Sequence, residues 1–168
     1  MLPEPAASIV LPSTRFAGRE AFAQLVRDSL VAAVQQDWRE IFFCDATFED
    51  WPLHEEAVAD ALYAWSKTGR RFVMFASRYD LVLRHHARFV SWRKTWDHIV
   101  EGRICRNLGS ADFPSALWSP TWAMRRLDLI RSTGVCGAEP DRRVHIREML
   151  DELMLNSNPG FPASTLGL

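Results

Sequence analysis

The chain has 168 residues, of which 48% are hydrophobic and 24% are charged, and its formal net charge is −1. These values are typical of one folded domain with a substantial core, and they exclude a chain that is disordered over most of its length. No apolar run approaches the roughly 20 residues that would span a bilayer, so we expect no membrane segment. The first residues also lack the basic start and long apolar run of a secretion signal, which predicts a cytoplasmic protein.

The three cysteines are Cys44, Cys105 and Cys136, and none stands in a C-x-x-C pair. This spacing supports neither a zinc knuckle nor a redox motif. Cys44 and Cys105 lie in apolar runs, and buried free thiols of that kind are typical of a reducing compartment. The sequence therefore predicts no metal site, and no motif in it indicates a cofactor.

The first half of the chain alternates between helical and strand patterns. After an extended lead-in at residues 1–17, apolar residues recur at helical spacing over residues 18–36. Ile41–Cys44 and Arg71–Ala76 are short apolar runs, which are typical of strands buried on both faces of a parallel sheet. Between them we expect a helix over residues 52–69, with proline in its first turn and glycine at its end. This order predicts βαβ crossovers and an α/β fold, with a mostly parallel or mixed sheet flanked by helices.

The second half of the chain is less regular. We still expect one domain over residues 1–168, because no linker long enough to divide the chain interrupts it. The expected elements are a helix opening at Tyr79, strands at 103–108, 116–119 and 123–130, a turn between Gly134 and Gly137, a helix from Asp141 to about Asn156, and an extended tail at 157–168.

The central segment Tyr79–Arg106 carries the most unusual composition. It contains three of the five histidines, and residues 70–106 hold nine basic and three acidic residues. Apolar residues recur in it at the spacing of one continuous helix: Phe89, Trp92, Trp96 and Ile99. Such a stripe is either the buried face of the helix or, if exposed, a platform on which bases stack. Burial in the core is the interpretation that we favour.

Basic residues flank this stripe, and together they could follow the phosphates of an anionic partner: Arg84, Arg88, Arg93, Lys94, Arg103 and Arg106. Arginine suits bidentate contacts with phosphate groups. The alternative is that the basic segment pairs with the acidic N-terminal half of the same fold. The pattern leaves an anionic ligand, a nucleic acid and internal salt bridges open.

Asp45, Glu49 and Asp50 follow the first expected strand. In open α/β sheets, ligands favour the edge at the carboxyl ends of the strands. Carboxylates there could hold a metal with water or act as acid and base. The alternative is that they cap the next helix and form salt bridges with arginines.

The histidines of the central segment do not form a chelating set. His85 and His86 are adjacent, so on a helix they point about 100° apart, and His98 lies several turns away. One of them could act as a general base. However, the chain has no G-x-S-x-G, no Cys–His pattern, no P-loop and no G-x-G-x-x-G run. We therefore assign no catalytic residue and no metal ligand.

Three stretches together resemble a family of uncharacterised proteobacterial proteins, related segments of which are also appended to acetyltransferases of the GNAT type. They are DATFEDWPL at residues 45–53, RHHARFVSWRKTWDH at residues 84–98 and FPASTLGL at residues 161–168, and the similarity covers roughly residues 15–168. That family is similar to one half of the phospholipase D fold. The resemblance implies an α/β half of this type. Because such halves commonly pair across one site, it also implies a homodimer.

The phospholipase D signature is H-x-K-x4-D, in which the histidine is the nucleophile. The resemblance places it near Asp128, where Thr121 and Ala123 stand in the positions of the histidine and the lysine. Threonine and alanine can neither form a phosphohistidine nor bind a phosphate by charge. The resemblance therefore implies that phosphodiesterase activity is lost, and the chain also lacks an acetyl-CoA loop.

These observations favour a non-catalytic domain that binds an anionic ligand or a protein partner. Two alternatives stay open: a phosphodiesterase-like hydrolase with an atypical His/Asp site, and a nucleic-acid binder that uses the basic central helix. The candidate ligand-binding residues are Asp45, Asp50, Arg84, His85, His86, Arg88, Arg93 and His98.

Overall fold

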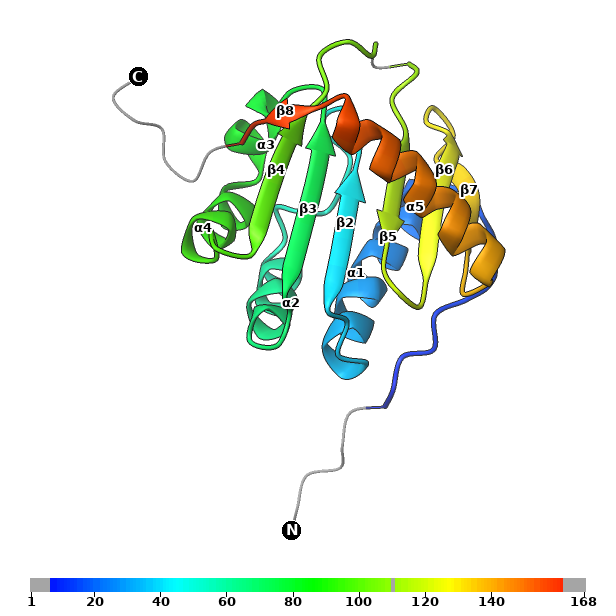
Figure 1. Ribbon diagram of the computed structural model, residues 1–168. Coiled ribbons are helices and arrows are strands. Elements are labelled where there is room, and N and C mark those ends of the chain that lie inside the picture. Colours follow the sequence, from blue (N-terminus) through cyan, green and yellow to red (C-terminus); the bar gives the residue numbers. More distant parts are fainter. Residues whose placement is uncertain (1–6, 110, 162–168) are drawn as a thin grey trace.

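Eight strands form one mixed sheet in the order β1-β7-β6-β5-β2-β3-β4-β8 (Figure 1). The computed structural model describes residues 7–109 and 111–161. The strands are β1 Thr14–Phe16, β2 Glu40–Cys44, β3 Arg71–Ala76, β4 Val100–Ile104, β5 Ser115–Trp118, β6 Ala123–Asp128, β7 Thr133–Gly137 and β8 Asn158–Pro159. The helices are α1 Arg19–Gln35, α2 Glu56–Ser66, α3 Asp80–His85, α4 Ala87–Thr95 and α5 Pro140–Leu155.

The centre of the sheet is parallel, as the alternating pattern of the first half predicts. β2, β3 and β4 run in the same direction, with Phe42 opposite Val73 and Val73 opposite Glu101. α2 connects β2 to β3, and α3 with α4 connects β3 to β4, so the three amino ends meet at one edge of the sheet. β5, β6 and β7 follow antiparallel to their neighbours. The prediction of an α/β fold with a mixed sheet flanked by helices is confirmed.

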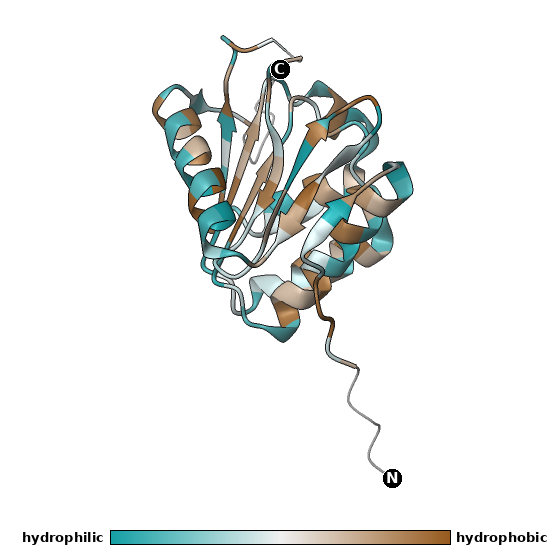
Figure 2. Ribbon diagram, turned by 90° about the vertical axis from the view of Figure 1, so that its right-hand side faces the viewer, coloured by the Kyte–Doolittle hydropathy of each residue, from teal (hydrophilic) through white to brown (hydrophobic). Residues whose placement is uncertain are grey.

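Helices cover both faces of the sheet, and each face has its own apolar core. In Figure 2 the sheet lies between α5 and the other helices. α1, α2 and α4 pack against one face, which includes Phe43, Phe72 and Leu117. α5 packs against the other face, which includes Phe42 and Phe75. Successive residues of a strand point to opposite faces, and this is why a strand covered on both sides reads as a continuous apolar run.

The expected lead-in, residues 1–17, is described from residue 7 onward and ends in the edge strand β1, where Phe16 lies opposite Gly134 of β7. Gly134 and Gly137 do not bracket a turn, so that prediction is wrong: both lie within β7. A Cβ atom at Gly134 would lie 2.1 Å from the Arg125 carbonyl oxygen. The close approach of β6 therefore requires glycine at this position.

The segment after α5 returns to the sheet. β8 pairs with β4, and the Gly160 N–H donates to the Gly102 carbonyl at 2.9 Å. Phe161 is buried, and its ring stacks on Tyr79 with the ring centroids 4.7 Å apart. The expected tail at 157–168 is thus described as far as Phe161, and residues 162–168 lie outside the described residues.

The segment that begins near Tyr79 is not one helix, so the prediction of a continuous helix is wrong. α3 ends at His85 and α4 begins at Ala87, because His86 has φ −121° and ψ 54°, outside the helical region. The buried His86 ring lies 2.8 Å from the Phe48 carbonyl oxygen. This contact with a distant loop holds the break in place.

The strand that follows α4 also begins earlier than expected. α4 ends at Thr95, so His98 lies in a loop, and β4 spans Val100–Ile104 in place of the expected 103–108. Gly102, which precedes the expected strand, therefore lies inside β4. A Cβ atom at Gly102 would lie 2.6 Å from the Gly160 carbonyl oxygen, so the approach of β8 requires the glycine.

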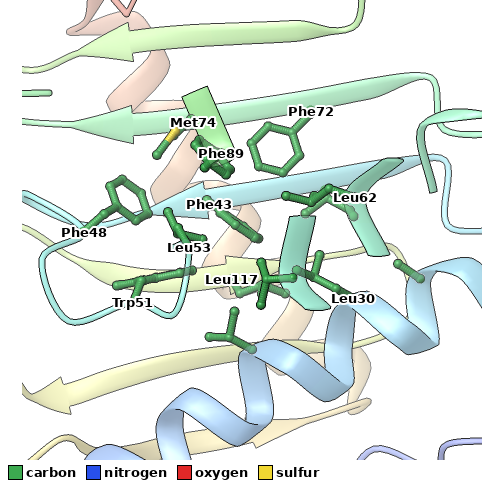
Figure 3. Close-up of a cluster of buried hydrophobic side chains, with 14 of the residues drawn as sticks. Leu30, Phe43, Phe48, Trp51, Leu53, Leu62, Phe72, Met74, Phe89 and Leu117 are labelled. Carbon is green, nitrogen blue, oxygen red and sulfur yellow. The ribbon is translucent and has the colours of Figure 1, made fainter. Parts of the chain in front are cut away.

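The loop between β2 and α2 is part of the core. α2 begins at Glu56, and the expected helix start at Pro52 is wrong because this proline lies in the preceding turn. Figure 3 shows Phe48 and Trp51 of this loop gathered with Phe43 of β2. The ring centroids of Phe43 and Trp51 lie 4.9 Å apart, and those of Phe48 and Trp51 lie 4.8 Å apart. Aromatic packing therefore replaces the first turn of a helix.

Candidate functional site

The carboxylates that follow β2 are held by a buried arginine of β6. Arg126 Nη2 lies 2.9 Å from Asp45 Oδ1, and Arg126 Nη1 pairs with Asp50. The side chains of Arg126, Asp45 and Asp50 are 2%, 7% and 25% exposed. Arg126 Nε also donates to Ser115 Oγ at 2.9 Å, and the guanidinium lies 4.1 Å from the centre of the Phe22 ring. The two carboxylates and the guanidinium therefore form one buried ion cluster.

This ion cluster leaves the carboxylates little freedom. Burial on its own would lower the pKa of Arg126, but hydrogen bonds and charge from Asp50 and Asp45 raise it above its ordinary value. The second oxygen of Asp45 accepts the Phe48 N–H at 2.8 Å and the Thr47 N–H at 3.2 Å. Carboxylates that are held by these partners are not free to hold a metal ion. The geometry favours the salt-bridge alternative for Asp45 and Asp50.

His86 is buried beside the same loop. A carbonyl oxygen can only accept, so the His86 Nε2 atom donates to Phe48 at 2.8 Å and the neutral ring leaves Nδ1 without a hydrogen. Nδ1 has no partner among the described residues. Burial lowers the pKa of His86, although the Phe48 carbonyl opposes this effect. The ring is therefore neutral at pH 7, and it ties α4 to the loop after β2.

The other predicted histidines do not join Asp45 in one cleft. His98 is exposed before β4, whereas Asp45 follows β2, and these parallel strands place the two residues at opposite edges of the sheet. His85 is exposed on the last turn of α3, next to exposed Arg84. An atypical His/Asp site would need its groups within hydrogen-bond reach of one another, and the fold separates His98 from Asp45.

The basic flank of the central segment is divided between surface and core. Arg88 is exposed and donates to the His54 carbonyl at 2.9 Å. Arg93 is buried, donates to the Phe161 carbonyl at 2.8 Å and pairs with Asp97 at 2.7 Å. Its guanidinium therefore anchors the end of the described chain, and the prediction that Arg93 faces an anion does not fit its contacts.

The tryptophans of the same segment are packed, as the sequence analysis favours. Trp92 is fully buried, and its Nε1 donates to Ser66 Oγ at 2.8 Å. Trp96 is partly buried against the same core. Its Nε1 is buried and has no partner among the described residues.

A concavity of about 790 Å³ lies at the amino edge of β2, β3 and β4, and we call it the amino-edge basin. Three segments that each precede one of these parallel strands form it: the turn after α1, the end of α2, and the loop between α4 and β4. It is lined by Asp37, Arg39, residues 66–70, Trp96, His98 and Ile99.

Two of the three segments are tied together beneath the basin. The Arg39 carbonyl accepts the N–H groups of Arg70 at 2.9 Å and Arg71 at 3.1 Å. Trp65 Nε1 donates to the Trp38 carbonyl at 2.6 Å. These bonds join the turn after α1 to the end of α2 and to β3, so the basin has a fixed floor.

Positive charge dominates the amino-edge basin. Arg39, Lys67 and Arg70 line it and are exposed, and the described residues provide no salt-bridge partner for any of them. Exposed His98 stands beside Trp96, with the ring centroids 5.6 Å apart. Three cations outweigh one carboxylate and the roughly half negative charge at the C-terminal end of α2.

Of the residues that line the basin, only His98 is among the candidate ligand-binding residues predicted from the sequence, and Trp96 and Ile99 belong to the predicted apolar stripe. Arg39, Lys67 and Arg70 belong to no motif, and up to 31 positions separate them. The available signal was their place directly before the two expected strands Ile41–Cys44 and Arg71–Ala76.

The described part of the chain contains no group of three or more His, Cys, Asp or Glu side chains able to hold a metal ion. The cysteines are free and buried, as predicted for Cys44 and Cys105, and burial raises the pKa of all three thiols. None of the described helices is both long enough and apolar enough to span a membrane.

Comparison with protein families and with curated proteins gives no match. Among solved structures, the chain is similar to TrmBL2, an archaeal chromatin protein whose structure shows a novel mode of DNA binding. The TM-score is 0.65 at 13% sequence identity, and the match covers 92% of this chain and 56% of the TrmBL2 chain. At this identity the likeness shows a shared fold alone. The chain thus has the α/β fold of a region that makes up 56% of TrmBL2.

Proposed function

We propose that this chain is a non-catalytic binding domain whose ligand carries clustered negative charge, and that the amino-edge basin receives that charge. The observation that carries the proposal is the convergence of Arg39, Lys67 and Arg70 on one concavity, without salt-bridge partners in the described part of the chain. By contrast, the buried guanidinium of Arg126 is neutralised by Asp45 and Asp50. Cations left open on a concave surface are therefore available to a ligand.

Phosphate groups suit the chemistry of the basin. Two of its three cations are arginines, whose planar guanidinium groups bind phosphate oxygens in pairs, and the third is a lysine that acts as a point charge. The volume of about 790 Å³ lies in the range of small-molecule sites, about 300–1,000 Å³. It is large enough for a phosphate chain together with an attached group.

A nucleic acid is the form of phosphate ligand that a specific observation favours. The fold is shared with TrmBL2, a chromatin protein that binds DNA. The basin also places the rings of Trp96 and His98 beside its cations. Aromatic rings next to a basic surface are typical of sites for single strands, where bases stack while the cations follow the backbone.

We also propose, from the sequence resemblance, that the fold is one half of a phospholipase D-like unit without its catalytic signature. Thr121 lies in the turn before β6 and Ala123 begins this strand. Asp128 ends β6, and its Oδ1 accepts the N–H groups of Ile130 and Arg131 at 3.0 Å each. Pairing of two halves predicts a dimer in light scattering, whereas a mass of 19.2 kDa would contradict the pairing.

The binding proposal is tested by fluorescence anisotropy with a labelled single-stranded oligonucleotide, and with pyrophosphate as competitor. Three phosphate contacts predict a slope of log K against log salt of about −2, so a fourfold rise in salt should weaken binding about fifteenfold. Binding of pyrophosphate without binding of the oligonucleotide would support the anion site and refute the nucleic-acid form. Binding of neither at low salt would refute the proposal.

Two matched triple variants locate the site. The combination Arg39→Gln, Lys67→Gln and Arg70→Gln should abolish most of the binding. The control combination Arg84→Gln, Arg88→Gln and Arg106→Gln removes the same charge from the exposed part of the central segment and should bind within about threefold of the wild type. Loss of binding in the control, with retention in the basin variant, would move the site to the central segment.

A further inference from the structure

A second concavity lies beyond the carboxyl end of β4, on the face of the sheet that α5 covers. Its volume is about 380 Å³, which falls in the range of small-molecule sites. α5 supplies Met149 and Leu153 to its walls, and the segment between β4 and β5 supplies Leu108 and Pro114. These walls are apolar, so the pocket suits a ligand with an apolar body.

Small residues of the sheet lie next to Arg125, which lines the pocket. Cys44 of β2 lies opposite Ala116 of β5, and Ala116 lies opposite Arg125 of β6. In Figure 1, α5 crosses in front of these strands. From β2 the chain continues to β3 and β4 on one side, and it then returns to place β5 on the other side of β2. The strand order therefore reverses between β2 and β5, and ligands in open α/β sheets favour the carboxyl edge at such a reversal.

Arg125 brings to this pocket a positive charge that no described residue neutralises. Its Nε is buried and makes no hydrogen bond within the described residues, and the described residues offer it no salt bridge. A buried donor without an acceptor costs about 1–3 kcal/mol, and more when it is charged. Asp112 and Glu152 also line the pocket, are exposed, and form no salt bridge within the same residues. The pocket therefore presents a cation and two carboxylates around an apolar interior.

We propose that this pocket binds a small apolar α-amino acid. Its carboxylate would take the hydrogen bonds of the Arg125 guanidinium, and its ammonium group would face Asp112 and Glu152. Its side chain would pack on Met149 and Leu153. The thiol of Cys105 also lines the pocket, and it stays protonated because burial raises its pKa, so the site binds its ligand without a covalent step.

This site is independent of the proposed function. The amino-edge basin lies at the other edge of the sheet and is formed with α2 and the loop after α4, whereas this pocket lies under α5. The two sites share none of the residues that line them. Failure of one proposal therefore leaves the other untouched.

Three probes that differ by one charged group test the ligand chemistry by isothermal titration calorimetry. L-Leucine carries both charges, 4-methylpentanoate lacks the ammonium group and 3-methylbutylamine lacks the carboxylate. We expect L-leucine to bind, and each analogue to bind at least about tenfold more weakly. The proposal is overturned if 4-methylpentanoate binds as tightly as L-leucine, or if neither L-leucine nor L-methionine binds at about 10 mM.

Two variants locate the amino acid. Arg125→Gln should weaken L-leucine binding at least about tenfold, and Glu152→Gln, a change on the exposed side of α5, should weaken it severalfold. Arg84→Gln is the control and should bind as the wild type does. If Arg125→Gln does not fold, the affinity of Glu152→Gln for L-leucine tests the assignment by itself. Unchanged L-leucine binding in a folded Arg125→Gln or in Glu152→Gln would overturn the assignment.

Discussion

Replacement of Arg126 by methionine tests whether the predicted carboxylate site is structural. Methionine keeps most of the aliphatic length of the side chain and removes the guanidinium. Asp45 and Asp50 then lose their cation, while Asp45 stays 7% exposed in a packed loop. The change therefore leaves negative charge uncompensated inside the fold.

The magnitude follows from the burial of the three groups. Breaking a buried ion pair by removing one partner costs about 3–5 kcal/mol. Asp50 is 25% exposed, so water recovers part of the energy of its pair, which favours the lower half of that range. Loss of the contact between the guanidinium and the Phe22 ring, 4.1 Å away, adds about 1 kcal/mol. We expect Arg126→Met to lower the free energy of unfolding by about 4 kcal/mol and the melting temperature by about 10 °C.

Urea unfolding followed by circular dichroism measures this change, with the exposed Arg84→Met as control within about 0.5 kcal/mol of the wild type. Asp45→Asn in the Arg126→Met background should restore part of the loss, because it removes the unpaired charge. A loss below about 1 kcal/mol for Arg126→Met would refute the reasoning. The two carboxylates would then be free to serve a ligand.

Three further changes test separate parts of the fold. Burial lowers the pKa of His86 in the folded protein, so the unfolded chain binds the proton more readily. The wild type should therefore lose stability relative to His86→Gln as the pH falls below about 6.5. Equal dependence of the free energy of unfolding on pH in the two proteins, measured by urea unfolding, would contradict this. Gly69→Ala places a Cβ atom 2.4 Å from the Trp65 ring and should cost about 1–3 kcal/mol in thermal melts, whereas Gly109→Ala, with open space around it, should be neutral. Phe161→Ala removes a buried ring that stacks on Tyr79 and should cost about 3 kcal/mol in urea unfolding, and an unchanged midpoint would show that the end of the described chain does not stabilise the fold.

Patterns of neighbouring residues in the sequence predict the elements that are buried on every side. The run Arg71–Ala76 is apolar because α5 covers one face of β3 and the remaining helices cover the other, and the strand has the bounds expected from the sequence. Trp92 was expected in the core and is fully buried. In both cases burial requires apolar residues, either consecutive along a strand or at helical spacing, and this pattern is visible in the sequence.

Contacts between distant segments left no such signal. The break at His86 depends on the carbonyl of Phe48, 38 positions away, so the periodicity of the segment does not predict it. For Asp45 and Asp50 the sequence leaves a ligand site and salt bridges open, because their partner, Arg126, comes 81 and 76 positions later. The amino-edge basin arises only when parallel strands bring three loops to one edge. The order of the strands in the sheet therefore determines which residues line the basin, and a single sequence specifies this order only weakly.

The most direct test of the amino-edge basin is a titration with pyrophosphate followed by nuclear magnetic resonance of the backbone amide and indole N–H groups. Trp96→Phe assigns the indole signal of Trp96 among those of the seven tryptophans. We predict that this signal and the amides of residues 67–70 shift with a common dissociation constant, while the amides of Arg84 and Arg88 stay in place. Shifts confined to Arg84 and Arg88, or no shifts at low salt, would contradict the assignment of the anion site to the basin.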